Sequence, residues 1–366
     1  MTSLDTATPA GTRSDSDSRT ETVRVVVATP LRQELVERIA AVGARVEVVV
    51  DHDLLPPMRY PADHAGDPSF ARTPEQEARF EELLTSADVV YGIPDLDPKR
   101  IAATVRANPG LRWLTTMAAG GGAAVAAAGL TPQELERVTF TTSAGVHGVP
   151  LAEWALFGIM AGAKELPRLL ADQASHSWPE RVVSRPIEGS TVLVFGLGGI
   201  GEQVARLSRA LGMRVLGASR SAAPVEGVEV HRVADLPQII GEADHIVVTL
   251  PGTAQTEGLL GADLLSRAKP GVTVVNVGRG TVIDEPALID ALQDGRVGFA
   301  ALDVTAVEPL PADSPLWDLP NVLISPHTAA LDAREEERIC DQFCDNLRAF
   351  LDGRPMINVV DPAAGY

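Results

Sequence analysis

The chain has 366 residues, of which 45% are hydrophobic and 22% charged, a composition typical of a globular protein with about two domains. The net charge of −18 disfavours a nucleic acid partner, because a polyanion would be repelled. We expect no membrane partner, since no apolar stretch is long enough to span a bilayer and residues 1–20 lack the apolar core of a signal peptide. The polar composition of residues 1–20 predicts a disordered tail.

Short apolar segments alternate with helical patterns in the first part of the chain. A β-α-β start is predicted without a glycine-rich phosphate loop, so this part need not bind a nucleotide. Residues 51–75 are rich in Pro, Asp and His and predict a long surface loop. The predicted strands are 22–28, 45–50, 87–93, one that begins at Leu111 and runs into a glycine-rich turn at Gly121, and 138–144; the predicted helices are 31–43 and 75–87.

A long, mostly apolar helix is predicted over 150–170, and its composition favours packing between domains or subunits. A second series of strands and helices follows it. Short apolar strands that alternate with helices indicate a parallel sheet covered on both faces. The strands of this series are expected over 190–196, 213–219, 245–251, 273–278, 299–304 and 321–326.

The final predicted helix, over 333–352, carries both cysteines of the chain, Cys340 and Cys344, one helical turn apart. They form no Cys-x-x-Cys motif and no cluster with histidines, so we expect packing residues rather than a metal site or a disulfide framework. Two thiols suit a protein of the reducing cytoplasm.

The strongest single motif follows the strand at 190–196. Gly196, Gly198 and Gly201 form G-x-G-x-x-G at the opening of a helix, with Gly199 and Ile200 between them. The first glycine permits a tight turn, the second lets the backbone approach a pyrophosphate, and the third allows close packing of helix on strand. The helix N-terminus favours the negative charge of the phosphates. This context predicts a dinucleotide site.

The end of the next strand indicates which dinucleotide binds. An NAD site usually has a carboxylate there to hold the ribose hydroxyls. This chain has Ser219, Arg220 and Ser221 instead, and a guanidinium with two hydroxyls can hold a 2′-phosphate. We therefore expect NADP(H) to be preferred, with NAD(H) possible.

Four separated segments together resemble one family. They are the glycine loop, VNVGRGTVID (275–284), AALDVTAVEP (300–309) and SPHTAAL (325–331). The chain resembles the D-isomer-specific 2-hydroxyacid dehydrogenases, which include glyoxylate/hydroxypyruvate reductases and phosphoglycerate dehydrogenases. The resemblance covers about residues 85–366 and is weaker before that.

The resemblance implies two Rossmann-like doubly wound α/β domains of parallel sheet with the active site in a cleft. The substrate domain is expected to combine residues 21–148 with 331–366, so that the C-terminal helix returns to the first domain, and the dinucleotide domain to span 149–330. The family also implies a homodimer that involves the helix at 150–170.

The resemblance further implies three catalytic residues whose chemistry suits reduction of a 2-oxo acid. Arg279 can pair its planar guanidinium with the substrate carboxylate and the 2-oxygen. His327 can exchange a proton near neutrality as a hydride arrives at C2. Glu308 would orient the imidazole and stabilise its protonated form. Because formate dehydrogenases have an amide residue in the slot of Glu308, a hydroxyacid substrate fits better.

The resemblance also implies roles for residues near these three catalytic residues. Asp303 is expected to accept from the nicotinamide carboxamide, and Pro251, Thr256 and Val277 to lie beside the cofactor. The turn at Gly120 and Gly121 is expected to aim backbone N–H groups at the substrate carboxylate.

This sequence also departs from the family. Gly122 replaces the usual Asp after the glycine turn, which puts the turn geometry in doubt. His147 could line the substrate pocket or cap the helix that follows it. Trp178 could cover either a partner subunit or the cleft.

Three functions remain open. The preferred one is an NADP(H)-dependent reductase of a small 2-oxo acid such as glyoxylate or hydroxypyruvate. A second is an NAD-linked enzyme like phosphoglycerate dehydrogenase, although we expect no appended regulatory domain in a chain that ends at Tyr366. A third is a dinucleotide-sensing interaction protein like the corepressors that resemble this family.

Overall fold

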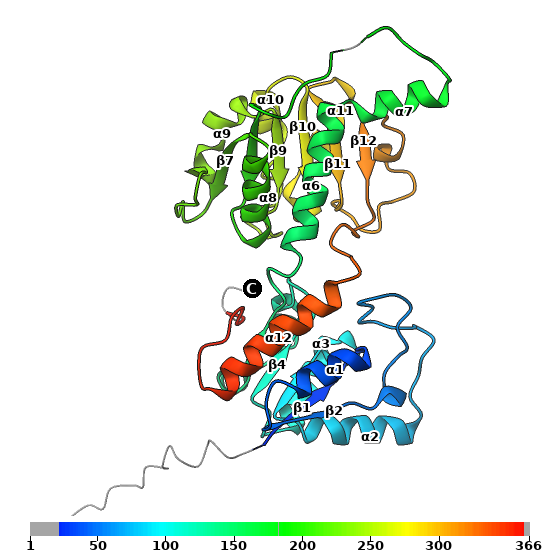
Figure 1. Ribbon diagram of the computed structural model, residues 1–366, viewed down its shortest axis with the longest axis vertical. Helices are drawn as coiled ribbons and strands as arrows, with labels where there is room; N and C mark the ends of the chain where they lie inside the picture. Colours follow the sequence, from blue (N-terminus) through cyan, green and yellow to red (C-terminus); the bar gives the residue numbers. More distant parts are fainter. Residues whose placement is uncertain (1–21, 182, 362–366) are drawn as a thin grey trace, which may run out of the picture. The chain divides into compact units, whose positions relative to one another are not determined.

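The computed structural model describes residues 22–181 and 183–361, and the predicted tail over 1–20 lies outside them. The chain forms two compact units (Figure 1). Unit 1 combines Met1–Ala144 with Ala333–Tyr366, and unit 2 is Gly145–Asp332. Each unit is an α/β domain built on its own sheet.

The sheet of unit 1 has five strands in the order β2-β1-β3-β4-β5, and every neighbouring pair is parallel. Its strands are short runs rich in β-branched and aromatic residues, which suit a sheet buried on both faces. They are β1 (Val23–Val27), β2 (Val46–Val49), β3 (Val89–Tyr91), β4 (Trp113–Thr115) and β5 (Thr139–Thr141).

Helices cover both faces of this sheet. On one face α12 (Glu335–Leu351) packs beside α1 (Gln33–Ala40), and Phe343 stacks on Trp113 with 4.7 Å between ring centroids. The predicted return of the last helix to the first domain is therefore confirmed, as Figure 1 shows. The other face carries α2 (Pro74–Thr85), α3 (Pro98–Ala107) and α4 (Gly122–Ala127), and α5 (Pro132–Arg137) precedes β5.

The segment between β2 and α2 is not the plain surface loop that was predicted. It begins with a short 3-10 helix, η2 (His52–Leu54), and Leu54, Leu55 and Ala62 are buried in unit 1. Asp63 is buried too, because the Arg59 side chain and two backbone N–H groups satisfy its carboxylate. The prediction also missed α3, although Asp97 followed by Pro98 is a helix-start signal.

The sheet of unit 2 has seven parallel strands in the order β12-β11-β10-β9-β6-β7-β8. All six predicted strands are present. The edge strand β8 was not predicted, because its polar sequence EVHR lacks an apolar run. The strands are β6 (Thr191–Phe195), β7 (Arg214–Ser219), β8 (Glu229–Arg232), β9 (His245–Val248), β10 (Val272–Asn276), β11 (Val297–Leu302) and β12 (Val322–Ile324).

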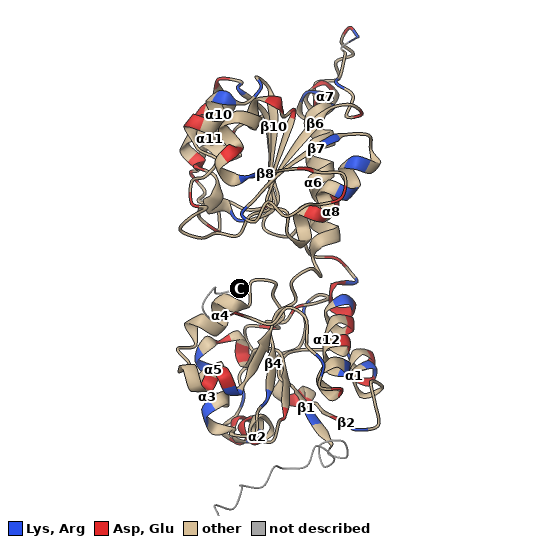
Figure 2. Ribbon diagram, turned by 90° about the vertical axis from the view of Figure 1, so that its left-hand side faces the viewer, with Lys and Arg blue, Asp and Glu red and all other residues tan. Residues whose placement is uncertain are grey.

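Two apolar layers cover this sheet, which makes the unit doubly wound as predicted. One layer comes from α6 (Gly148–Ala163) and α8 (Gly199–Ala210). The opposite layer comes from α9 (Leu236–Ile239), α10 (Ala262–Arg267) and α11 (Glu285–Gln293). Figure 2 shows charged residues mainly on helices and loops, with the strands largely free of them.

The single helix predicted over 150–170 is wrong. The helix α6 ends at Ala163, and a separate helix α7 (Leu166–Ala174) begins after a break. Glu165 adopts a left-handed conformation with φ of 53°, and Pro167 follows in the first turn of α7. Proline has no N–H to donate to the preceding turn of a helix, and a left-handed residue interrupts a right-handed helix. The chain therefore turns between α6 and α7.

Candidate functional site

The glycine loop joins β6 to α8 as the motif predicts. Gly196 has φ of +102°, a conformation that side chains rarely adopt. A Cβ on Gly201 would collide with the carbonyl oxygen of Gly196, so only glycine permits this approach of helix to strand. A Cβ on Gly198 would meet nothing within 4 Å, which leaves its outer side open. The geometry therefore fits a pyrophosphate at the N-terminus of α8.

A residue that the motif did not indicate supports this loop. The hydroxyl of Thr249, directly after β9, donates to the carbonyl oxygens of Phe195 and Gly196 at 3.0 and 2.9 Å. These bonds tie the first turn of the glycine loop to the neighbouring strand end. A polar residue after an apolar strand is the only sequence signal for it.

The end of β7 lies next to the glycine loop, because β7 and β6 are neighbours in the sheet. Ser219 accepts a hydrogen bond from the N–H of Ala222 at 3.1 Å, and Ser221 accepts one from Ala223 at 3.3 Å. Both hydroxyls keep their own proton to donate. Arg220 is exposed between them, so the end of β7 presents donors and no carboxylate.

Arg279 follows β10 in a turn between Gly278 and Gly280, and both glycines lie in close contact with neighbouring backbone. A Cβ on Gly278 would lie 2.6 Å from the carbonyl oxygen of Leu250, and one on Gly280 would collide with Thr305. The buried Asn276 closes the turn by accepting from the N–H of Gly278 at 3.0 Å and donating to the carbonyl of Arg279 at 3.1 Å.

The guanidinium of Arg279 makes one hydrogen bond within the described residues. Its Nη1 donates to the carbonyl oxygen of Gly278 at 2.8 Å, and within the described ranges no carboxylate pairs with it. The side chain is exposed. A cation without a protein carboxylate is suited to an anion from solution.

In the predicted cofactor-side loop after β9, the side chain of Thr256 bonds to the backbone of the same loop. The hydroxyl of Thr256 donates to the carbonyl of Pro251 at 2.6 Å and accepts from the N–H of Thr253 at 2.9 Å. Val277 is buried just before the turn of Arg279. Pro251 and Val277 thus follow β9 and β10, two strands that are neighbours.

His327 and Glu308 meet directly. Nδ1 of His327 and Oε2 of Glu308 are 2.7 Å apart, and the other carboxylate oxygen of Glu308 accepts from the N–H of Thr305 at 3.2 Å. His327 has φ of +54°, an uncommon conformation for a residue with a side chain. Because Glu308 occupies Nδ1, the second ring nitrogen, Nε2, is left to face other groups.

Asp303 holds the segment that carries His327. Its Oδ1 accepts from the hydroxyl of Ser325 at 2.7 Å and from the N–H groups of Thr328 and Ala329 at 2.9 Å each. The carbonyl of Asp303 accepts from the N–H of His327 itself at 2.9 Å. Asp303 is 2% exposed, and its Oδ2 accepts no bond from the described part of the chain.

A cavity of about 450 Å³ in unit 2 borders the pair of His327 and Glu308. Its wall continues through Leu310, Trp317 and Ile324, so the imidazole and carboxylate stand beside apolar side chains. Both side chains remain partly exposed to solvent, at 49% for His327 and 37% for Glu308, so the pair is accessible from this cavity.

Three predicted residues, Gly120, Gly121 and His147, do not follow strands of the unit 2 sheet. Gly120 and Gly121 belong to unit 1, in the turn between β4 and α4. The N–H of Gly120 donates to no group in residues 22–181 and 183–361, which leaves it for an anion. A Cβ on Gly121 would collide with Thr116. His147 is the N-cap residue of α6 in unit 2, but its side chain makes no capping hydrogen bond.

The structure therefore brings most of the predicted site to one edge of one sheet. His327, Glu308 and Arg279 follow β12, β11 and β10, and the glycine loop follows β6 in the same parallel sheet. Ligands of such sheets bind at this carboxyl edge. No cluster of metal-ligating side chains occurs among the residues described, nor is any helix there long and apolar enough to cross a membrane.

Comparisons with known proteins point to one family. The profile "D-isomer specific 2-hydroxyacid dehydrogenase, NAD binding domain" matches residues 156–329. Glyoxylate/hydroxypyruvate reductase B of Pectobacterium atrosepticum is 37% identical over 220 residues, which are 58% of this chain and 68% of that protein. D-3-phosphoglycerate dehydrogenase of Mycobacterium bovis is 32% identical over 331 residues, 89% of this chain but only 57% of that protein.

Solved structures extend the likeness to nearly the whole chain. A D-isomer specific 2-hydroxyacid dehydrogenase from Xanthobacter autotrophicus Py2, in complex with NADPH and MES, has a TM-score of 0.73 at 28% identity and covers 94% of this chain and 100% of that one. An NADPH-dependent glyoxylate/hydroxypyruvate reductase from Sinorhizobium meliloti, in complex with NADP and sulfate, has a TM-score of 0.71 at 27% identity with the same coverage.

The fold and the edge of unit 2 define a nicotinamide-dinucleotide oxidoreductase class. The chain belongs to the D-isomer specific 2-hydroxyacid dehydrogenase family, whose members are NAD(P)-dependent enzymes that act on CH–OH donors.

The bonds of Asp303 yield a first prediction. Replacing Asp303 with Ala strands the N–H groups of Thr328 and Ala329, and the free energy of unfolding should fall by about 1–3 kcal/mol. Asp303→Asn keeps a carbonyl oxygen as acceptor and should lose clearly less. Urea denaturation followed by circular dichroism measures both variants. Equal stability of the two variants would show that the Asp303 oxygen does not hold this segment.

Proposed function

We propose that this protein is an NADP(H)-dependent reductase that converts a 2-oxo acid to the 2-hydroxy acid. The observation that carries the proposal is the 2.7 Å pair of His327 and Glu308 at the same sheet edge as Arg279 and the glycine loop. A 2-oxo acid needs a cation for its carboxylate and an acid for its oxygen, and this edge supplies both.

The reduced nicotinamide, when bound, supplies the hydride that goes to C2 of the substrate. Gly196, Gly198 and Gly201, with Gly199 and Ile200, would hold the pyrophosphate, and the carboxylate of Asp303 would accept from the carboxamide. Pro251, Thr256 and Val277 would line the cofactor.

The protein's own groups do the rest. Arg279 pairs with the substrate carboxylate, and the turn of Gly120 and Gly121 in unit 1 is assigned to substrate binding. Nε2 of His327 gives its proton to the 2-oxygen, and Glu308 holds the ring through Nδ1 and stabilises the imidazolium. His147 is assigned to the substrate pocket.

Turnover tests this assignment. We expect NADPH to be oxidised in the presence of 2-oxo acids, and His327→Ala to lower kcat by about 10²–10⁴ because the proton donor is lost. Arg279→Ala should chiefly raise KM for the acid. His231→Ala, on the edge strand β8, is the matched control and should keep its rate. Near-normal kcat in His327→Ala would remove this residue from the mechanism; NADPH binding without turnover of any 2-oxo acid would favour a sensor.

The preference for NADP(H) rests on the end of β7. Ser219, Arg220 and Ser221 present donors where an NAD enzyme has a carboxylate, and two similar solved structures contain NADPH or NADP. Arg220 pairs with the 2′-phosphate in this proposal, and the two hydroxyls donate to it. The alternative is an NAD-linked enzyme like the mycobacterial phosphoglycerate dehydrogenase.

Arg220→Ala separates these alternatives. We expect kcat/KM with NADPH to fall by about 10- to 100-fold, since a charge-assisted bond is lost, while the value with NADH changes little. Arg206→Ala, an exposed arginine on α8, serves as the control for general charge. An unchanged ratio of NADPH to NADH use in Arg220→Ala would contradict the assignment.

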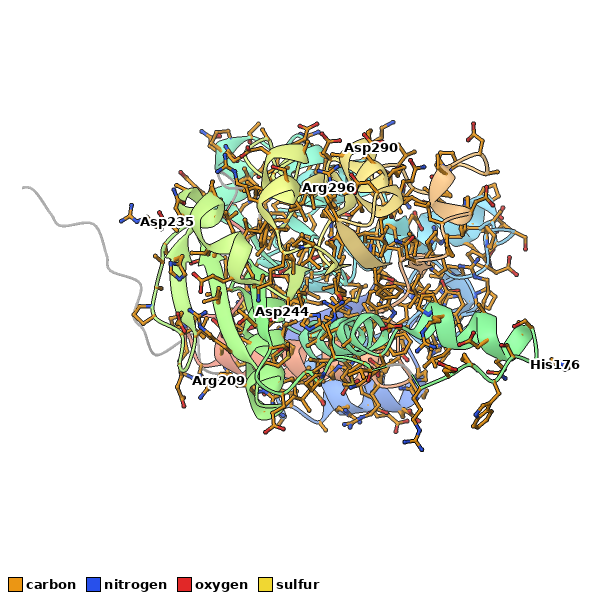
Figure 3. All side chains as sticks on the ribbon, turned by 90° about the horizontal axis from the view of Figure 1, so that it is seen from above. His176, Arg209, Asp235, Asp244, Asp290 and Arg296 are labelled. Atoms are coloured by element: carbon orange, nitrogen blue, oxygen red, sulfur yellow. The ribbon has the colours of Figure 1, made fainter. Side chains whose placement is uncertain are left out.

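We also propose that two copies of the chain associate through α6 and the chain after it. Val149, Phe157 and Met160 lie at helical spacing on one face of α6 and remain exposed within the chain. Figure 3 labels His176 beyond the end of α7, where the chain extends away from the sheet. Further exposed apolar side chains lie on α7 and in the chain after it, namely Leu169, Leu170, Trp178 and Val183.

A charge on this surface should separate the copies. Since contiguous exposed apolar patches mark interfaces, Phe157→Glu is expected to convert a dimer to a monomer by desolvation of the new carboxylate. Light scattering after size exclusion gives the mass, and Leu211→Glu on the rim of α8 is the control. A wild-type chain that is monomeric at micromolar concentration would rule the dimer out.

A further inference from the structure

The loop that carries Glu308 is tied mainly to itself. It follows β11, and its tip is exposed from Val307 to Pro309. The N–H of Thr305 donates to Oε1 of Glu308 at 3.2 Å, and the hydroxyl of Thr305 donates to the carbonyl of Val307 at 2.8 Å. Both bonds stay within the loop. The position of the Glu308 carboxylate therefore depends on what holds Thr305.

One carboxylate from another element holds this loop. Oε2 of Glu285 accepts from the N–H of Ala306 at 3.0 Å. Apart from the contact of Glu308 with His327, this is the only hydrogen bond that residues 305–309 make to another element in the described part of the chain. Loss of Glu285 would therefore leave the loop without its outside hydrogen bond.

Glu285 stands on a firmly packed helix. It is the first residue of α11, and the side chain of the N-cap residue Asp284 accepts from the N–H of Ala287 at 3.2 Å. The inner face of this helix packs into the core of unit 2, through Leu288, Ala291 and Leu292. A carboxylate at the start of such a helix is a fixed point against which an exposed loop can be held.

The peptide between Thr305 and Ala306 also touches the turn of Arg279. A Cβ on Gly280 would collide with the carbonyl of Thr305 and with the nitrogen of Ala306. The turn and Glu285 thus fix the same peptide. Because a peptide group is planar, fixing its N–H also fixes the carbonyl of Thr305. The backbone of Thr305, which bonds to the catalytic carboxylate, is held in consequence.

We propose that Glu285 is a positioning residue for the reduction. Its carboxylate holds the peptide of Thr305 and Ala306, which places Glu308 against Nδ1 of His327. Glu285 acts only through these groups and is assigned no contact with substrate or cofactor. This role rests on the function proposed above and adds a residue to its machinery.

A second effect of Glu285 has to be separated from this one. The positive end of the helix dipole favours an acidic residue in the first turn of α11, whatever that residue does for catalysis. Glu285→Gln removes the charge but keeps an oxygen that can accept from Ala306. Glu285→Ala removes both. Glu285→Asp keeps the charge but shortens the side chain by one carbon.

Steady-state kinetics test the proposal, with NADPH and whichever of glyoxylate and hydroxypyruvate reacts faster. Glu285→Ala should lower kcat by about 3- to 10-fold, the scale of one lost hydrogen bond. KM for the acid should change by less than about twofold, because Asn276 closes the turn of Arg279 independently. Glu285→Gln should keep kcat within about twofold of the wild type. Asp290→Ala, an exposed carboxylate on the same helix that is labelled in Figure 3, is the matched control.

A double-mutant cycle shows whether Glu285 acts through Glu308. In a Glu308→Ala background, Glu285→Ala should lower kcat no further, because no carboxylate is left to be positioned. A merely structural role would cost the same factor in both backgrounds, and that result would overturn the proposal. If Glu285→Ala does not fold, Glu285→Asp takes its place in the cycle.

Two further outcomes separate this proposal from the function on which it rests. An unchanged kcat in both Glu285→Ala and Glu285→Asp would overturn the positioning role and leave the reductase standing. No turnover of any 2-oxo acid by the wild-type protein would overturn both.

Discussion

One oxygen atom of Asp303 accepts three hydrogen bonds from the residues around His327, and the backbone carbonyl of the same residue accepts a fourth. These bonds keep His327 in a left-handed conformation that a histidine seldom adopts. In this conformation the ring meets Glu308 at 2.7 Å. The proton donor of the proposed reaction therefore depends on a buried carboxylate that need not touch the substrate.

The proposed chemistry also explains how a strongly acidic chain can use an anionic substrate. With a net charge of −18, the overall field does not attract a carboxylate. In the proposed reaction the attraction is local and comes from Arg279, which no described carboxylate neutralises. Most other arginines in the described part of the chain, such as Arg72 and Arg214, pair with nearby carboxylates.

The two units hold their candidate residues in different ways. Unit 2 contains the glycine loop and all three catalytic candidates, and its strand ends leave little freedom for variation. Unit 1 contains the 51–73 segment, which is held by Asp63 and Thr29 rather than by regular secondary structure. Irregular segments change more easily than strands, so substitutions in this segment should cost less stability than substitutions in the sheets.

Sequence patterns alone determined most of the fold, because apolar strands, the glycine motif and the family segments are local signals. They predicted the strands of both sheets except β8, whose polar edge position has no apolar run to reveal it. They also indicated His327, Glu308 and Arg279. The tertiary structure decided what depends on distant contacts. Thr249 and the anchoring bonds of Asp303 act through partners on other loops, and a cavity beside Ile93 exists only because a segment of irregular sequence folds back over a sheet edge.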